Sequence, residues 1–145
     1  MDIKRRNVEE FAGFHFFTDY PFIIDGIPCK SLESFLRAMK YDNIIVQRLV
    51  CDLSAKSAKT YATTYTWASV NTFHWRGTSY SKESREFNEL LTRAFDELYK
   101  NQNFRLALKQ ISLEKLNLLG EELKSETILP SYKLIFQLHR LNAKL

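Results

Sequence analysis

The chain has 145 residues, a formal net charge of +4 and an isoelectric point near 9.1. With 45% hydrophobic and 26% charged residues, it has the composition of a folded domain and not of a disordered segment. No apolar run approaches the roughly 20 residues that cross a bilayer, and no apolar stretch follows the charged residues 1–6, which argues against a secretory signal. We therefore expect one domain over residues 1–145, in the cytoplasm and without membrane contact; for a viral chain this is the host cytoplasm.

The remaining composition argues against a structural metal site and a disulfide framework. Cys29 and Cys51 fit no metal-ligand spacing, and two cysteines make no framework, so we expect reduced, buried thiols. His15, His74 and His139 include no pair at i,i+4, which makes a zinc site improbable. We expect neither a metal ion nor a cofactor. The modest positive charge favours an anionic ligand without identifying nucleic acid as the partner.

A β-hairpin is the first predicted element. Residues 21–24 and 27–29 are β-prone runs on either side of Asp25-Gly26, and both residues of that pair tolerate the positive φ of a tight hairpin turn. Pro28 lacks a backbone N–H and must lie at an edge of the hairpin.

A series of helices follows, predicted from capping residues and apolar periodicity. The expected spans are about 31–41 after Ser31, 43–53 after Asn43, 54–64 after Ser54, 81–100, 101–111 after Asn101, 113–119 after Ser112 and before Gly120, and a last helix after Pro130. Residues 60–78 show no clean period and are predicted as a loop with some extended structure. The predicted fold class is mainly α within α+β, a compact helical assembly with a small N-terminal hairpin.

The most informative stretch is residues 17–41, F-T-D-Y-P-F-I-I-D-G-I-P-C-K-S-L-E-S-F-L-R-A-M-K-Y. It contains an ordered set of motif positions: Phe17, Tyr20-Pro21, Asp25-Gly26, Glu33 and Ala38-x-Lys40-Tyr41. In these positions the chain resembles the NADAR (YbiA-like) family, and residues 99–105 resemble another segment of that family more loosely. The resemblance implies a YbiA-like fold and N-glycosidase activity on ribosylamine intermediates of riboflavin synthesis or on ADP-ribosylated guanine.

The residue types in this stretch suit the same chemistry. Glu33 and Lys40 are two helical turns apart, and Arg37 lies between them at i+4 from Glu33, so all three lie close to one face of the predicted helix. A lysine whose pKa is lowered by partial burial can attack an anomeric carbon, and a carboxyl group can protonate the leaving base or activate water. We predict Glu33 and Lys40 as the catalytic residues.

Five residues are predicted to bind the substrate: Phe17, Tyr20, Arg37, Trp75 and Arg76. The aromatic side chains would stack on a planar base, and Arg37 would contact a phosphate. The alternatives are plainer. Glu33 can be a first-turn helix acid and Lys40 a solvated residue near the helix C-terminus. Arg37 can be the i,i+4 partner of Glu33, and the aromatic residues can belong to the core.

Three functions remain open at this stage. The first is an N-glycosidase acting on a small-molecule nucleotide or an ADP-ribosylated nucleobase, including one within a nucleic acid. The second is an inactive protein that sequesters an ADP-ribose-like nucleotide, because residues 116–130 lack the Trp-Gly and glycine loop of the NADAR family. The third is a helical interaction module. The Lys, Asn, Tyr and Phe content suggests an AT-rich genome such as that of a phage.

Overall fold

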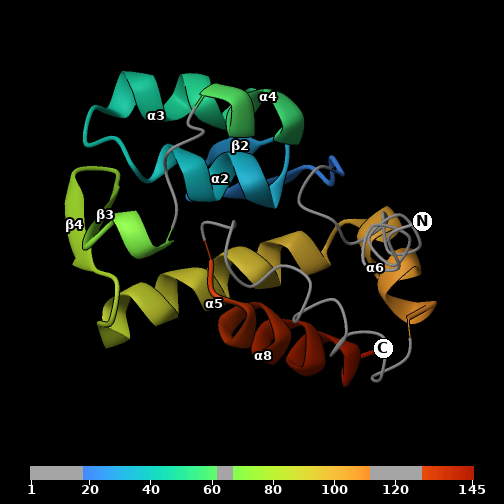
Figure 1. The fold of residues 1–145 in the computed structure, drawn as a ribbon. Helices are drawn as coiled ribbons and strands as arrows, with labels where there is room; N and C mark the ends of the chain where they lie inside the picture. The colour runs from blue at the N-terminus through green and yellow to red at the C-terminus, as the bar shows by residue number, and fades with distance from the viewer. Residues whose placement is uncertain (1–17, 62–66, 112–128) are drawn as a thin grey trace, which may run out of the picture.

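The computed structural model describes residues 18–61, 67–111 and 129–145, which form a helix-rich α+β structure (Figure 1). The strands are β1 (Phe22–Ile24), β2 (Ile27–Cys29), β3 (Thr72–Trp75) and β4 (Thr78–Ser81). The helices are α2 (Leu32–Ala38), α3 (Ile44–Cys51), α4 (Ala55–Tyr61), α5 (Arg85–Tyr99), α6 (Gln102–Lys109) and α8 (Ser131–Asn142), with a 3-10 turn at Trp67–Ser69. The predicted fold class is confirmed.

The first hairpin confirms the prediction at Asp25-Gly26. Strands β1 and β2 pair antiparallel, and both turn residues have positive φ, 51° and 77°. Side chains alternate along the two strands, so that Ile23 and Pro28 face outward while their neighbours on both strands are buried. One side of this small hairpin therefore belongs to the core, and the other is presented to solvent.

A second hairpin, β3–β4, lies where a loop with some extended structure was predicted; the extended part is a regular pair of strands that continues past residue 78, where the prediction ended. Its turn is Arg76-Gly77, again with positive φ at both residues, 52° and 86°. Phe73 and Trp75 are buried on one face of β3, which is the period of two that identifies a half-buried strand. Gln47 of α3 holds this hairpin, because its side chain donates to the His74 carbonyl and accepts from the Arg76 backbone N–H.

Helix α2 occupies the centre of the structure, and each of its residues is buried. Ser31 caps it as predicted, in a reciprocal pair of hydrogen bonds with Ser34. The helix ends at Ala38 and not near residue 41. There the Met39 carbonyl accepts a hydrogen bond from the backbone N–H of His74, 2.8 Å away, so a contact with β3 replaces the next helical turn.

The other helices form two groups beside α2 and the first hairpin. Helices α3 and α4 pack against α2, while α5 contacts β1 and carries α6 and α8 (Figure 1). The caps Asn43 and Ser54 confirm the predicted starts of α3 and α4. Asn101 caps α6 at the point where the long helix was predicted to break, and α5 begins after Ser84, later than expected. The predictions for Ser112, residues 113–119 and Gly120 lie outside the described residues. Within the described ranges, no helix is long and apolar enough to cross a membrane.

Candidate functional site

A buried ion pair lies within α2. Arg37 Nε donates to Glu33 Oε1 over 3.0 Å, and the two side chains are only 1% and 2% exposed. The i,i+4 partnership considered from the sequence is therefore confirmed. Because Ser31 caps the helix just before Glu33, the carboxylate lies in the first turn of a helix that α3 and α4 enclose.

The pair leaves half of the carboxyl group without a partner. Glu33 Oε2 is buried and accepts no hydrogen bond from any described residue. Burial raises the pKa of Glu33 above its ordinary value, although the charges of Arg37 and Lys59 act in the opposite direction. A carboxyl group whose pKa is raised by burial holds its proton to higher pH than a solvated one, which is a property of general acids.

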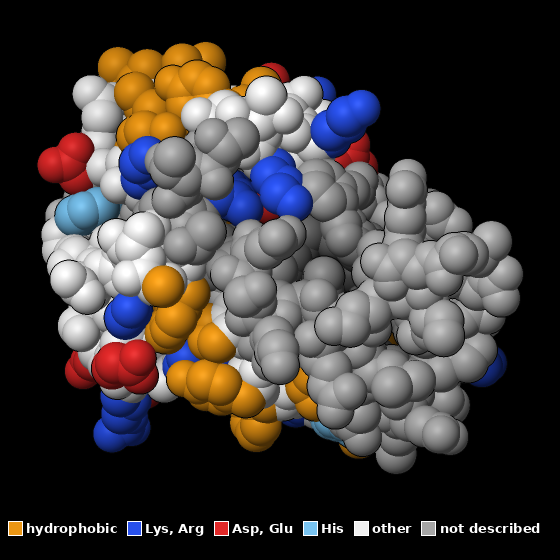
Figure 2. Space-filling view, viewed as in Figure 1, with side chains coloured by type: hydrophobic (Ala, Val, Ile, Leu, Met, Phe, Trp, Pro, Cys, Tyr) orange, Lys and Arg blue, Asp and Glu red, His pale blue; other side chains and the backbone are white. Residues whose placement is uncertain are grey.

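Cations and aromatic rings lie at the junction of α2 and α4, and one of the cations acts on Glu33. Lys59 of α4 lies close enough to Glu33 for its charge to stabilise the carboxylate. Tyr41 and Tyr61 meet across the junction with ring centroids 5.9 Å apart, and Lys40 Nζ lies 5.6 Å from the centre of the Tyr41 ring. Figure 2 shows Lys and Arg side chains gathered on the face below α3 and α4. An anionic ligand with a planar group suits such a surface.

Lys40 is placed differently from the expectation. It follows the end of α2, its backbone N–H bonds to the Arg37 carbonyl in a tight turn, and its side chain is exposed. The burial that the nucleophile argument requires is therefore missing. An exposed ammonium group in this position is suited to attracting a phosphate.

The predicted stacking residues belong mainly to the scaffold. Trp75 is buried against Phe35, with ring centroids 4.9 Å apart, and its indole N–H donates to Asp25, so no ring face remains for a base. Arg76 is exposed in the turn of the β3–β4 hairpin. Tyr20 packs edge-on against Phe104, and burial raises the pKa of the Tyr20 hydroxyl. Phe17 lies outside the described residues.

Sequence reasoning missed Lys59, Tyr41 and Tyr61 as members of this site. A signal was present for Lys59, because Ala55 and Ala58 form the buried face of α4 and Lys59 lies four residues after Ala55. The described residues hold no group of three or more His, Cys, Asp or Glu side chains arranged to bind a metal ion.

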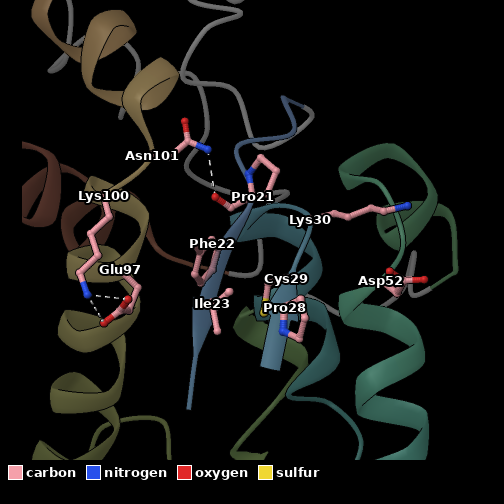
Figure 3. A pocket seen from close by; sticks show the side chains of 10 residues that line it. All are labelled: Pro21, Phe22, Ile23, Pro28, Cys29, Lys30, Asp52, Glu97, Lys100 and Asn101. Carbon is pink, nitrogen blue, oxygen red and sulfur yellow. Dashed lines mark hydrogen bonds and ion pairs between the residues drawn. The ribbon is translucent and has the colours of Figure 1, made fainter. Parts of the chain in front are cut away.

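Two grooves lined by described residues lie elsewhere, beside the first hairpin. One has a volume of about 630 Å³, and Figure 3 shows its floor of Phe22, Ile23 and Pro28 between Lys100 on one side and Asp52 on the other. The second, of about 550 Å³, runs from the hairpin turn along α3. Neither groove includes Glu33 or Arg37.

Comparison with known proteins gives the family. The chain is 36% identical over 95 residues to an uncharacterized 17.1 kDa protein in the Gp30-rIII intergenic region of Enterobacteria phage T4; the match covers 64% of this chain and 62% of the phage protein. No solved structure matches. A family model described as bacteriophage protein GP30.3 matches residues 12–143, and no NADAR model matches, so the NADAR assignment made from residues 17–41 is wrong. The phage origin suggested by composition is supported. The chain belongs to the bacteriophage protein GP30.3 family.

Proposed function

We propose that the α2–α4 site cleaves the C–N bond between a ribose and a base in an anionic nucleotide. The observation that carries this proposal is the Glu33 carboxyl group. It is buried, one of its oxygens has no partner among the described residues, and burial raises its pKa. A buried carboxyl group whose pKa is raised is suited to donate a proton to a leaving group.

The chemical step needs only Glu33 and a water molecule. Glu33 donates a proton to a nitrogen of the base as the C–N bond breaks, and the bonding electrons leave with the base. Water then adds to the anomeric carbon, and the Glu33 carboxylate accepts the proton that the water loses. The carboxyl group is restored, and the products are the free base and a sugar with a hydroxyl group at its anomeric carbon.

Cations at the junction of α2 and α4 favour an anionic substrate. Arg37 keeps the carboxyl group in position through its 3.0 Å hydrogen bond. Lys59 and the exposed Lys40 provide positive charge from two elements, which favours a phosphate group next to the ribose. Tyr61, which is exposed at the edge of the junction, offers a ring on which a base can stack.

The direct test is release of a free base. Purified protein is incubated with ADP-ribosylated guanine nucleosides and with ribosylaminopyrimidine phosphates, and the base is measured by chromatography. We expect release by the wild type, a loss of about 10²–10⁴-fold in kcat for Glu33→Gln, and a raised KM for Lys59→Ala. Lys56→Ala is the matched control, because Lys56 is an exposed lysine on the same helix. If the folded wild type releases no base from any substrate, the enzymatic proposal fails.

Nucleotide binding without turnover is the second candidate. It is favoured by the position of Lys40, which is exposed beyond the end of α2 and lacks the burial that would make it a nucleophile. Calorimetric titration with ADP-ribose and NAD separates the two candidates. Binding that Lys59→Ala weakens, together with no base release, supports the binder, whereas no heat of binding for either ligand removes it.

A further inference from the structure

An apolar surface on α3 is open to solvent. Ile45 and Leu49 are 72% and 64% exposed and lie one helical turn apart, while Val50 and Cys51 on the opposite face are buried. A helix at the surface of a monomer usually carries polar residues on its outer face. In Figure 2, hydrophobic side chains accordingly form a patch over α3 at the top of the molecule. Such patches commonly mark interaction surfaces.

The α3 surface continues into the two grooves beside the first hairpin. Leu49 lines the groove of about 550 Å³ together with Pro28, and Pro28 also lines the neighbouring groove of about 630 Å³. Ile23, which is exposed on β1, lies in the floor of that second groove (Figure 3). The surface thus has both protruding apolar side chains and a concave apolar strip, so a copy of the same surface could complement its shape.

Two charged side chains on this surface indicate which partner it binds. Arg48 and Asp52 both line the groove along α3, and neither side chain has an ion-pair or hydrogen-bond partner among the described residues. They are four residues apart and of opposite sign. Two α3 helices that pack antiparallel across a two-fold axis near Leu49 would bring Arg48 of each copy against Asp52 of the other, so the surface is complementary to itself in charge as well as in shape.

We infer that α3 and the outer face of the β1–β2 hairpin form a two-fold interface between two copies of this chain. A self-complementary interface must present a feature and its counterpart on the same patch. This surface presents an apolar ridge, Ile45 and Leu49, beside an apolar groove, and a cation, Arg48, beside an anion, Asp52. The inference is independent of the chemistry proposed for Glu33, because that pair lines neither groove.

Charge reversal tests the interface by sedimentation velocity over a concentration series. We expect the wild type to form a dimer, and Arg48→Asp and Asp52→Arg each to raise its dissociation constant about tenfold or more, because like charges then face each other. The double variant R48D/D52R should restore the dimer, and an equimolar mixture of the two single variants should form a heterodimer. Lys109→Asp on α6, an equal change in charge away from the interface, should leave association unchanged.

Two results would overturn the inference. One is a wild-type chain that sediments as a monomer at every concentration. The other is a dimer that persists in both single charge variants while Leu49→Asp has no effect either. Since these residues are exposed, circular dichroism is expected to show that each variant is folded, and loss of association then reports on the interface.

Discussion

Two ion pairs in this protein have the same sequence spacing and different surroundings. Glu33–Arg37 in α2 and Arg85–Glu89 in α5 are both i,i+4 pairs, with N–O distances of 3.0 and 2.9 Å. The first pair is almost completely buried, whereas Arg85 and Glu89 are 87% and 60% exposed. Spacing and distance are therefore nearly the same, although the acid comes first in one pair and the base first in the other, and burial is the larger difference between them.

The physical consequences of burial are large. Water screens the Arg85–Glu89 pair, and holding two long side chains in one geometry offsets much of the attraction. Glu33 and Arg37 have lost their hydration, and each depends on the other and on neighbouring groups. One oxygen of Glu33 lacks a hydrogen-bond partner among the described residues. Burying this oxygen costs free energy, which a hydrogen-bond donor on a ligand could recover.

Breaking the buried pair gives the largest predicted effect. Glu33→Ala leaves the Arg37 guanidinium buried without its carboxylate, and we expect the free energy of unfolding to fall by about 3–5 kcal/mol. Urea denaturation followed by circular dichroism measures this change. Replacing both partners by apolar side chains of similar length, Glu33→Met with Arg37→Met, should recover most of the loss. A Glu33→Ala variant as stable as the wild type would show that the pair is hydrated in solution.

The ion pair could be predicted from its spacing, but its burial could not. Spacing, capping residues and turn residues are local properties, and they also predicted the first hairpin and the starts of most helices. Enclosure of α2 depends on where α3 and α4 lie, and that information is not contained in residues 31–38. The early end of α2 has the same origin, because the Met39 carbonyl bonds to His74, which lies 35 residues further along the chain.

The second hairpin was predicted only as some extended structure within a loop, and its strand pairing was missed for a local reason. Asp-Gly is a strong turn signal, whereas Arg-Gly is weaker because arginine is rarely found at positive φ. The alternation of Phe73 and Trp75 with polar residues was present but spans only four residues. Tyr61 lies against Tyr41, and Lys59 lies near Glu33, only because α4 packs on α2. The full set of residues at the candidate site could therefore be identified only from the structure.

A third carboxylate, of intermediate exposure, should give an intermediate loss of stability. Asp25 accepts hydrogen bonds from Arg93 at 2.7 Å and from the indole N–H of Trp75 at 2.9 Å. Asp25→Ala should lower the free energy of unfolding by about 1–3 kcal/mol, because the Trp75 N–H is left without an acceptor in a partly buried site. Asp25→Asn, which keeps an acceptor and tolerates the positive φ of the turn, should lose less. Equal losses in thermal or urea denaturation would contradict this explanation.

The pH dependence of stability should separate Glu33 from Asp25. Burial raises the pKa of Glu33 above 4.5, so the folded protein binds this proton more tightly than the unfolded chain. Stability should therefore fall as pH rises from about 4.5 to the raised pKa, by at most about 1.4 kcal/mol per pH unit. Hydrogen bonding from Arg93 lowers the pKa of Asp25 in the folded protein. The ionised Asp25 side chain therefore stabilises the fold above the pKa that it has in the unfolded chain. This stabilisation is lost as pH falls through the lower pKa of the folded protein.

Unfolding free energies measured from about pH 3 to pH 8 test the direction of the pH dependence expected for each carboxyl group. Glu33→Gln should flatten the decline at higher pH, and Asp25→Asn should reduce the loss in acid. Each variant serves as the control for the other, because the two carboxylates are expected to act over different pH ranges. A Glu33→Gln profile parallel to that of the wild type would mean that the Glu33 carboxyl group titrates normally.

The exposed Arg85–Glu89 pair should contribute least to the free energy of unfolding. The size of its contribution shows whether burial or spacing sets the strength of these pairs. Arg85→Ala removes the partner of Glu89 on a solvated face of α5, and we expect a loss of about 0.3–0.5 kcal/mol in low salt. The loss should shrink in high salt, because exposed charges are screened there, whereas the effect of Glu33→Ala should hardly change. Parallel urea titrations at two salt concentrations measure both variants. A salt-independent loss above about 1 kcal/mol for Arg85→Ala would mean that spacing within the helix, and not burial, sets the strength of these pairs.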